Sequence, residues 1–305
     1  MTSKAITLKK HLPARTVLWR CLLFVIAIGF AIAFLLPTIL TISNSFMEST
    51  EISSNYGIIF EKNEQGGKKY IAKRVNLKFI PDKVSLSQYS TALIKSPQYL
   101  LKFWNSVFLV APIVVFQIIV ATGAAYSFAR FRSKFKSIIF FVYTILMLMP
   151  YQVILVPNFL VSQYLGILNT RWAIILPGIF SPFSVFILTK FMRRIPVGII
   201  EAAKLDGCGE WQIFTKIALP VCKSTIYSIT ILVFIDYWNM VEQPLALMND
   251  AEMHPLSVFL SQVNSQDIGL AFAVAAFYMI PTLLMFLHGE QYLVEGIAYS
   301  GGVKG

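Results

Sequence analysis

Long apolar runs separated by short polar stretches dominate this chain. Six such runs contain few charged residues, and they lie near residues 17–42, 103–129, 137–160, 172–192, 224–246 and 268–291. An α-helix rises about 1.5 Å per residue, so about 20 residues cross the roughly 30 Å hydrocarbon layer of a bilayer. The pattern therefore predicts an all-α polytopic membrane protein with six transmembrane helices.

The polar stretch between the first two runs has its own pattern. NYGIIF and KKYIAKRVNLKFI are strand-like and flank the pair Gly66-Gly67, which predicts a small β-hairpin. The following VSLSQYSTALI is helix-like and leads back to the membrane. Such an insertion is either a structured spacer or a docking surface for an external partner, and the pattern favours neither.

A second polar stretch, residues 196–220, predicts two short helices joined by a turn. Pro196 suits a first helical turn because its φ is fixed and it has no N–H. Gly207 can adopt the left-handed conformation that ends a helix. We expect Asp206 to cap the helix that follows.

The second of these helices is expected to run from about Gly209 to Leu219 and to end at Pro220. Three apolar residues fall at i, i+1 and i+4 and share one side of it: Ile213, Phe214 and Ile217. An apolar side on a helix outside the membrane needs a cover. Either the membrane interface or a groove on another protein can supply one.

The distribution of basic residues predicts the orientation in the membrane, because short connections rich in Lys and Arg stay in the cytoplasm. Five basic residues lie before the first run or at its start, four in the second connection, and six in the fourth connection or at the end of the run before it, whereas the third has one and the fifth none. Both termini are therefore expected in the cytoplasm. The net charge of +11 reflects this topology and contact with anionic membrane lipid. Nucleic-acid binding is not expected, because the charges are divided between both sides.

Cysteine and histidine usage excludes two kinds of site. Cys21, Cys208 and Cys222 all fall on the expected cytoplasmic side, so no disulfide framework is predicted. His254 and His288 stand apart from any ligand cluster, and no metal is expected. The first apolar run follows a basic segment, but it is longer than the core of a signal peptide, so we expect it to be retained.

The fifth run contains an unusually polar sequence, FIDYWNMVEQPL. Polar and charged side chains in a membrane normally face a cavity or a partner. At 100° per residue, Asp236, Asn239 and Gln243 share one helix face, and Trp238 lies on another. The candidates for solute contact are Asp236, Tyr237, Trp238, Asn239 and Gln243. Alternatively, Asn239 and Gln243 join helices, and Trp238 is a packing residue or an interface anchor.

The stretch PVGIIEAAKLDGCGEWQIFTKIALP resembles the EAA loop of ATP-binding-cassette (ABC) importer permeases. The matching positions are Glu201, Ala202, Ala203, Asp206, Gly207, Ile217, Leu219 and Pro220. The resemblance extends from about Val84 to the last residue through NSVFLVA, AAYSFARFR, MPYQVILVPNF, LGILNTRWAIILP and GGVKG. These motifs are similar to those of the carbohydrate-uptake subfamily typified by the maltose permease pair.

The resemblance implies that the loop, including Ile213 and Phe214, couples the membrane helices to a cytoplasmic ATPase. A second permease subunit, two ABC ATPase subunits and an extracytoplasmic solute-binding protein are the implied partners, in a bacterial-type plasma (inner) membrane. ATP and Mg are expected on the ATPase, because this chain has no G-x-x-x-x-G-K-[ST] loop. No cofactor and no enzymatic activity are expected on this chain. The C-terminal GGVKG either reaches towards the ATPase or is a frayed tail.

The predicted organisation has five parts: a cytoplasmic tail (1–16), a first transmembrane helix (17–42), an extracytoplasmic insertion (43–102), a permease core with five transmembrane helices (103–292) and a cytoplasmic tail (293–305). The expected function is the permease subunit of an ABC importer for a sugar, oligosaccharide or related polyol. The rivals are an ion-gradient-driven secondary carrier and a membrane scaffold that recruits a cytosolic partner. A carrier should show acids in several spans, and only Asp236 lies deep. Residues 240–243 depart from the family pattern WNDFLWPL, which leaves the solute open.

Overall fold

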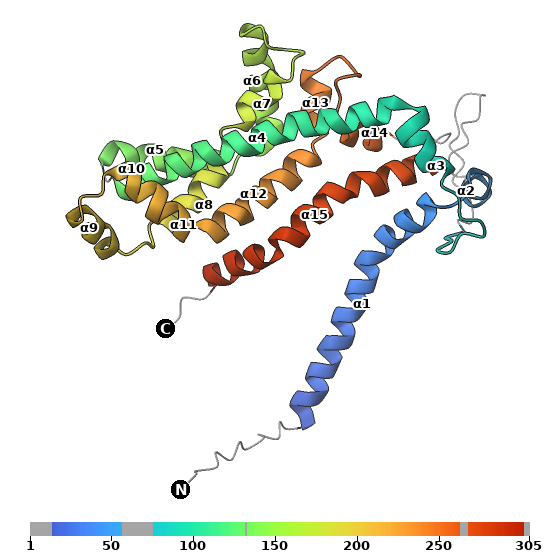
Figure 1. The fold of residues 1–305 in the computed structure, drawn as a ribbon, viewed down its shortest axis with the longest axis horizontal. Helices are drawn as coiled ribbons and strands as arrows, with labels where there is room; N and C mark the ends of the chain where they lie inside the picture. Colours follow the sequence, from blue (N-terminus) through green and yellow to red (C-terminus); the bar gives the residue numbers. More distant parts are fainter. Residues whose placement is uncertain (1–13, 57–75, 132, 263–267, 302–305) are drawn as a thin grey trace.

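The computed structural model describes residues 14–56, 76–131, 133–262 and 268–301, and these ranges fold into helices without a strand. Three helices are much longer than the rest: α1 (Ala14–Ser45), α4 (Pro97–Arg130) and α15 (Ile268–Gly301). Figure 1 shows α4, α12 (Lys223–Trp238) and α15 running together, while α1 leans away and meets α15 only near α2. The prediction of an all-α membrane protein is confirmed.

The number of spans depends on how bent helices are counted. Four helices in the described ranges are long and apolar enough to cross a membrane, and up to six spans result if each bent pair is one span. The run at 137–160 is such a pair, because α5 (Lys134–Leu146) and α6 (Tyr151–Tyr164) differ in direction by 109°. Pro150 stands at this break with an extended backbone, which a residue without an N–H tolerates well.

The fifth apolar run is also interrupted. Helix α12 ends at Trp238, and a short helix, α13 (Glu242–Leu247), follows after three residues. The prediction that Gln243 shares one helix face with Asp236 and Asn239 is therefore wrong, because the three do not belong to one helix.

Helix α4 forms the axis on which the remaining helices pack. One apolar cluster joins it to α8 (Pro182–Met192), α12 and the segment 200–222, with Ala125, Leu188 and Ile229 at its centre. A second cluster joins α4 to α7 (Trp172–Gly178) and α12 around Ile113 and Trp238. The same helix thus packs against both the coupling region and the interrupted fifth run.

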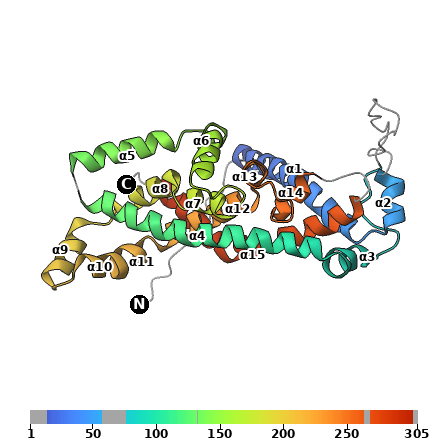
Figure 2. The ribbon, with the colours of Figure 1, turned by 90° about the horizontal axis from the view of Figure 1, so that it is seen from above.

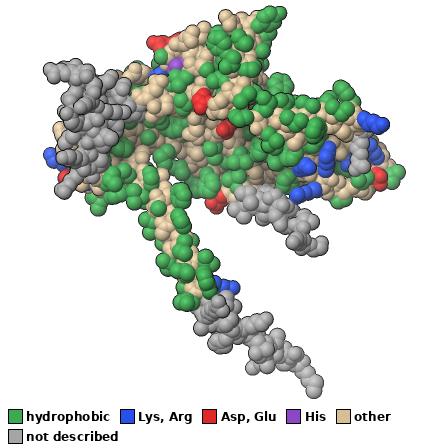
Figure 3. Space-filling view, turned by 180° about the vertical axis from the view of Figure 1, so that it is seen from behind, with side chains coloured by type: hydrophobic (Ala, Val, Ile, Leu, Met, Phe, Trp, Pro, Cys, Tyr) green, Lys and Arg blue, Asp and Glu red, His purple; other side chains and the backbone are tan. Residues whose placement is uncertain are grey.

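The two ends of the bundle differ in kind. Figure 2 places α9 (Val197–Leu205), α10 (Glu210–Ile213) and α11 (Leu219–Val221) at one end of the long axis and α2 (Ser49–Tyr56) with α3 (Ser87–Ser90) at the other. In Figure 3, basic side chains gather at the end that carries α9–α11, and apolar side chains cover α1 and the flanks of the bundle. The basic end is the one that the charge distribution predicts to be cytoplasmic.

The insertion after α1 is partly described. The hairpin centred on Gly66-Gly67 lies outside the described residues, but the near ends of its expected strands are not strands: Asn55 and Tyr56 end helix α2, and residues 76–80 are irregular. The helix expected over 84–94 is confirmed from Ser87 onward by α3 and the π-helical turn η2 (Thr91–Lys95), whereas residues 84–86 are not helical. In Figure 1 the short helix α13 lies near the middle of the molecule, and α14 (Leu256–Ser261) lies between it and this outer end.

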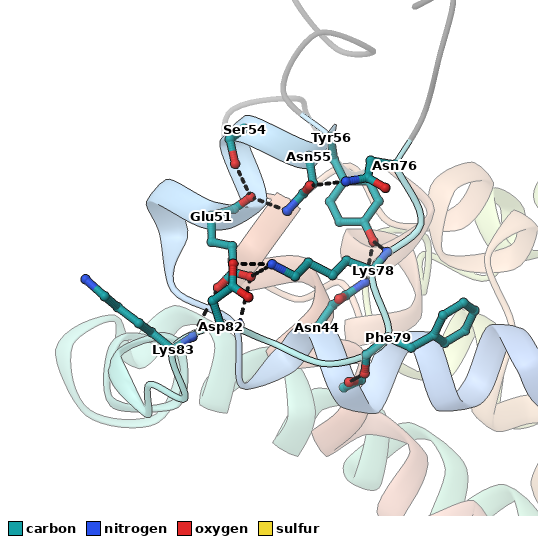
Figure 4. Close-up of polar contacts among 11 residues, drawn as sticks. Asn44, Glu51, Ser54, Asn55, Tyr56, Asn76, Lys78, Phe79, Asp82 and Lys83 are labelled. Carbon is teal, nitrogen blue, oxygen red and sulfur yellow. Dashed lines mark hydrogen bonds and ion pairs between the residues drawn. The ribbon is translucent and has the colours of Figure 1, made fainter.

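A polar cluster closes the insertion around Glu51, which we call the outer clamp (Figure 4). The Glu51 carboxylate accepts backbone hydrogen bonds from Asp82 (2.9 Å) and Lys83 (3.4 Å), and it pairs with the Lys78 ammonium at 2.8 Å. Lys78 also pairs with Asp82. The hydrogen bonds from Lys78 and Asp82 lower the pKa of Glu51, while Asp82 and Glu51 raise the pKa of Lys78. The clamp thereby ties residues 78–83 to α2.

Candidate functional site: a coupling turn and a membrane cavity

The turn within the segment 196–220 is built around Gly207. Helix α9 (Val197–Leu205) ends there, and Gly207 has a φ of +82°, which confirms the expected left-handed glycine. The Cys208 N–H donates to Ala203 O (2.9 Å), and the Gly207 N–H donates to Lys204 O (3.0 Å). This pair of bonds is the Schellman motif, and it satisfies the last carbonyls of the helix.

The capping of the next helix differs from the prediction. Asp206 is the C-cap of α9, so the expectation that it caps the following helix is wrong. Gly209 precedes α10 (Glu210–Ile213), and its N–H donates to Gln212 Oε1 at 3.1 Å. The side chain three residues into the helix therefore satisfies the free backbone donor at the start of this helix, without any contribution from Asp206.

The second helix is longer than its sequence suggests. After α10 the backbone continues through a π-helical turn, η3 (Phe214–Ala218), into α11 (Leu219–Val221). Pro220 does not end the helix, because it lies in the first turn of α11, where a missing N–H costs least. The break comes at Cys222, where the direction changes by 73° into α12.

The apolar side of this second helix is partly covered by the chain itself. Ile213 is fully buried, and Phe214 and Ile217 are half-buried. They pack in one cluster with Ile200 of α9 and Tyr126 of α4. The chain itself therefore covers Ile213, whereas Phe214 and Ile217 keep part of their surface exposed, and the choice between membrane interface and partner groove stays a prediction for that part.

A different set of side chains faces outward at the coupling turn. Leu205 is 88% exposed and Trp211 is 73% exposed. Of the residues singled out from the sequence, Glu201, Ala202, Asp206, Gly207 and Pro220 are exposed, Ala203 is buried and Leu219 is half-buried. The i, i+1, i+4 pattern does not predict Leu205 and Trp211, because both lie outside that stripe. A large apolar residue on these short helices that lies outside the stripe is itself the sequence feature that indicates an exposed apolar side chain.

One carboxylate connects the turn to the membrane bundle. Glu210 Oε2 accepts a hydrogen bond from the Tyr126 hydroxyl at 2.7 Å, and Glu210 Oε1 lies 2.7 Å from Lys204 Nζ. The hydrogen bonds from Lys204 and Tyr126 lower the pKa of Glu210. Each carboxylate oxygen therefore has a partner: one pairs with Lys204 near the end of α9, and the other accepts from Tyr126 of α4.

A cavity of about 550 Å³ opens where α6, α12 and α13 meet. Its lining includes Asp236, Tyr237, Asn239 and Gln243, so the interrupted helix still brings these four candidates together. The remaining lining residues are Tyr151, Gln152, Ile235, Met240, Val241 and Glu242. A smaller cavity of about 170 Å³ shares Tyr151, Tyr237 and Gln243 with it.

The cavity holds two carboxylates and no basic lining residue. Asp236 is exposed, and its carboxylate makes no hydrogen bond with a described residue. Glu242 accepts from the Gln152 amide at 3.2 and 3.3 Å, which leaves its charge uncompensated. The carboxylates, amides and phenols of this lining can donate to and accept from hydroxyl groups.

Trp238 lies outside the cavity lining. It is 1% exposed, its indole N–H donates to Tyr278 O at 3.2 Å, and its ring stacks on Phe234 and Tyr278. The packing alternative therefore describes Trp238. Asn239 has a mixed position: it lines the cavity, and its Oδ1 accepts from the Tyr278 hydroxyl of α15 at 3.2 Å, as a residue that joins helices does.

The histidines have structural partners in the described part of the chain. His254 Nε2 lies 2.7 Å from Met248 O, and His288 Nδ1 lies 3.0 Å from Leu284 O. Among the described residues, no group of three or more His, Cys, Asp or Glu side chains is arranged to hold a metal ion.

Sequence comparisons place the coupling turn and the cavity within one family match. The family described as "Binding-protein-dependent transport system inner membrane component" matches residues 117–290, more than half of the chain. The arabinooligosaccharides transport system permease protein AraQ of Halalkalibacterium halodurans is 29% identical over 290 residues, 92% of this chain and 96% of that protein. The lactose transport system permease protein LacG of Rhizobium radiobacter is 31% identical over 207 residues, 67% of this chain and 75% of that protein.

The fold is also similar to solved structures. A chain of a bacterial ABC transporter involved in the import of the acidic polysaccharide alginate superposes with a TM-score of 0.75 at 21% identity, covering 92% of this chain and 98% of that chain. A chain of a bacterial alginate ABC transporter in complex with alginate pentasaccharide-bound periplasmic protein gives a TM-score of 0.61 at 15% identity, covering 90% and 93%. At these identities the likeness concerns the fold. The resemblance to ABC importer permeases is confirmed, and the chain belongs to the family of binding-protein-dependent transport system inner membrane components.

Proposed function

We propose that the chain is one permease subunit of an ATP-driven importer for a sugar, oligosaccharide or related polyol. The observation that carries the proposal is the family match over residues 117–290, which contains both the coupling turn and the cavity. The names of AraQ and LacG point to arabinooligosaccharides and lactose as the cargo of relatives. A carbohydrate is therefore the solute class we infer for this chain.

The exposed side of the coupling turn is the surface we assign to an ATPase. Leu205 and Trp211 present apolar area to water beside Glu201 and Asp206, and such a patch is typical of a docking site. Ala203 and Ile213 are buried behind it, so we propose that they hold the surface in place rather than contact the partner. ATP and Mg²⁺ then belong to two ATPase subunits.

The remaining partners follow from the family. A second permease subunit completes the pathway, and an extracytoplasmic solute-binding protein delivers the solute; one of the structurally similar alginate transporters is in complex with a periplasmic protein that carries an alginate pentasaccharide. We place the coupling turn and both termini in the cytoplasm of a bacterial-type plasma membrane, because short connections rich in Lys and Arg stay there.

The cavity beside α12 is the proposed solute contact. Asp236 and Glu242 give its lining two acidic side chains without a basic neighbour in the lining. Acidic side chains accept hydrogen bonds from sugar hydroxyls and disfavour a second carboxylate. We therefore propose a saccharide without carboxylate groups, in contrast to the acidic alginate of the structural relative.

Reconstitution tests the function. The chain with its co-purifying permease, ATPase and binding protein is placed in liposomes, and uptake of the saccharides that co-purify is measured with and without ATP. We expect ATP-dependent uptake by the complex and none by this chain alone. Uptake by this chain alone in an ion gradient would support the secondary carrier. Partner recruitment without any uptake would support the scaffold.

Asp236→Asn tests the cavity, because it keeps the shape of the side chain and removes the charge. We expect about a fivefold change in the half-saturation or rate of uptake, with unchanged assembly. Glu252→Gln is the matched control, since Glu252 is exposed in the connection before α14 and does not line the cavity. Normal uptake kinetics for Asp236→Asn would remove Asp236 from the solute site.

A further inference from the structure

Tyr126 and Glu210 join the coupling turn to helix α4 of the bundle. Tyr126 lies near the end of α4, is 7% exposed, and donates its hydroxyl proton to Glu210 Oε2 at 2.7 Å. The other Glu210 oxygen pairs with Lys204 at 2.7 Å. One carboxylate therefore connects three elements: the end of α9, the start of α10 and a membrane helix.

Apolar packing of Ile213 and Phe214 also holds the second coupling helix against α4, but the turn at Gly207 and Gly209 is open. A Cβ built on Gly207 or Gly209 meets no atom within 4 Å, so nothing packs closely around this part of the turn. Tyr126 makes two contacts here: its hydroxyl donates to Glu210, and its ring centroid lies 5.1 Å from that of Phe214. Tyr126 thus touches the second coupling helix at both its first residue and its π-helical turn.

Helix α4 extends from this contact to the neighbourhood of the cavity. Ile113 of the same helix packs in the cluster that contains Trp238 and Tyr237, and Tyr237 lines the cavity. From Tyr126 to Phe103, whose ring contacts Trp238, the helix spans about 35 Å at 1.5 Å per residue. A displacement at the coupling turn therefore has a continuous helical path to α12.

We propose that Tyr126 and Glu210 form a positioning link that transmits movement of the coupling helices to α4 and from there to the cavity. The inference rests on the proposed coupling function. Tyr126 does not contact the ATPase or the solute. Its hydroxyl acts through Glu210, and the link works because a hydrogen bond to a charged acceptor is short and directional.

The test measures how accessible the cavity is, with a chemical probe, so that the solute need not be known. Gln152→Cys places a thiol in the cavity lining, and its rate of maleimide labelling is measured in the assembled complex with and without Mg·ATP and vanadate. The parent chain gives the background from Cys21, Cys208 and Cys222. We expect the nucleotide to change the labelling rate at position 152 about fivefold.

Tyr126→Phe removes the hydroxyl and keeps the ring on Phe214. We expect the complex to capture the ATPase as before, because Leu205 and Trp211 are untouched, while the nucleotide-dependent change in labelling falls below twofold. Tyr143→Phe is the matched control. Tyr143 packs on the same apolar cluster, and its hydroxyl makes no hydrogen bond with any described residue.

Glu210→Gln separates the link from the ion pair. Its amide oxygen still accepts from Tyr126, but its pair with Lys204 is lost, so we expect most of the labelling change to remain. Glu210→Ala removes both contacts and should match Tyr126→Phe, and combining the two should add nothing further. A Tyr126→Phe complex that retains the full change would overturn the link. A parent complex without ATPase capture or without any change would overturn the proposed coupling itself, and the link with it.

Discussion

Two glutamates organise opposite ends of this molecule, and they do so differently. In the outer clamp, Glu51 accepts two backbone N–H groups and a lysine, all from one stretch of chain. At the coupling turn, Glu210 accepts from a lysine of α9 and a hydroxyl of α4. The first holds neighbouring segments together, whereas the second joins a surface turn to a membrane helix.

The two glutamate side chains also differ in how exposed they are. The Glu51 side chain is 11% exposed and the Glu210 side chain is 40% exposed. An exposed ion pair stabilises a structure weakly, typically by about 0–1 kcal/mol, and can rearrange at little cost. An enclosed carboxylate that satisfies backbone donors resists rearrangement, because each lost partner leaves an unpaired polar group. The comparison indicates a rigid outer anchor and an inner joint in which the exposed Lys204 pair can adjust while the buried Tyr126 hydroxyl holds Glu210.

The largest effect is expected from Gly207→Val, which breaks the inner joint at its turn. A β-branched side chain at a φ of +82° strains the backbone by at least about 1–2 kcal/mol, although the space around the Cβ is open. We expect α10 to reorient, ATPase capture to fall about tenfold and uptake to be lost, with normal membrane abundance. The measurements are pull-down, ATP hydrolysis and uptake.

Gly207→Ala is the control for this change, since its single methyl group costs less in the left-handed region. It should retain most of the capture. A valine variant that captures the ATPase and transports like the parent would mean that the turn is not the docking element.

The architecture was largely predictable because its signals are local. Apolar run length, the left-handed glycine and the EAA pattern each depend on a few neighbouring residues, and the structure has the helices and the positive φ at Gly207. The sequence did not predict what covers the apolar stripe, because that depends on packing between residues far apart in the chain. The stripe at Ile213 is covered by α4 and α9, and a periodicity argument cannot say which surface lies opposite.

The cavity lining was also only partly predictable from local sequence patterns. Helical periodicity placed Asp236 and Gln243 on one face, and the break after Trp238 changed the geometry while keeping both in the lining. Gln152 and Glu242 could not be paired from the sequence, because they lie 90 positions apart. The sequence also offered no signal for the contact between Tyr126 and Glu210, which are 84 positions apart.

Glu51→Ala tests whether the outer clamp is only an anchor. We expect amide hydrogen exchange at Asp82 and Lys83 to rise about tenfold, because both N–H groups lose their acceptor. ATPase capture and nucleotide-dependent labelling at position 152 should not change. If either of these readouts fell together with the local protection, the two ends would be coupled and the distinction drawn here would fail.

The pH dependence of the clamp is a smaller effect with a definite sign. Hydrogen bonding to Lys78 and to the Asp82 backbone lowers the pKa of Glu51 below its ordinary value of 4.5. The stabilisation is therefore fully present above that value and is lost as the pH falls through the lowered pKa. Hydrogen exchange at Asp82 should accelerate, beyond its intrinsic pH dependence, only below about pH 4.5. In Glu51→Gln this extra acceleration should be absent.

The smallest effect is expected from Tyr56→Phe, the outer counterpart of Tyr126→Phe. The Tyr56 hydroxyl accepts from Asn44 Nδ2 at 2.9 Å and from the Lys78 N–H at 3.3 Å, and its ring packs on Phe272 of α15. Phenylalanine keeps the ring contact, so the loss is limited to two hydrogen bonds, typically about 0.5–1.5 kcal/mol each. We expect a few-fold faster exchange at Lys78 and unchanged labelling at position 152.

The Tyr56 hydroxyl joins Lys78 to α1, the Tyr126 hydroxyl joins the coupling turn to α4, and removal of each deletes a single oxygen. The matched pair therefore separates the loss of a buried hydroxyl in general from the loss of a link between moving parts. If Tyr56→Phe reduced the nucleotide-dependent labelling as much as Tyr126→Phe, the effect at Tyr126 would reflect general loosening of the bundle. If only Tyr126→Phe reduced it, the difference between the two ends would rest on what each hydroxyl connects, because the chemical change is the same.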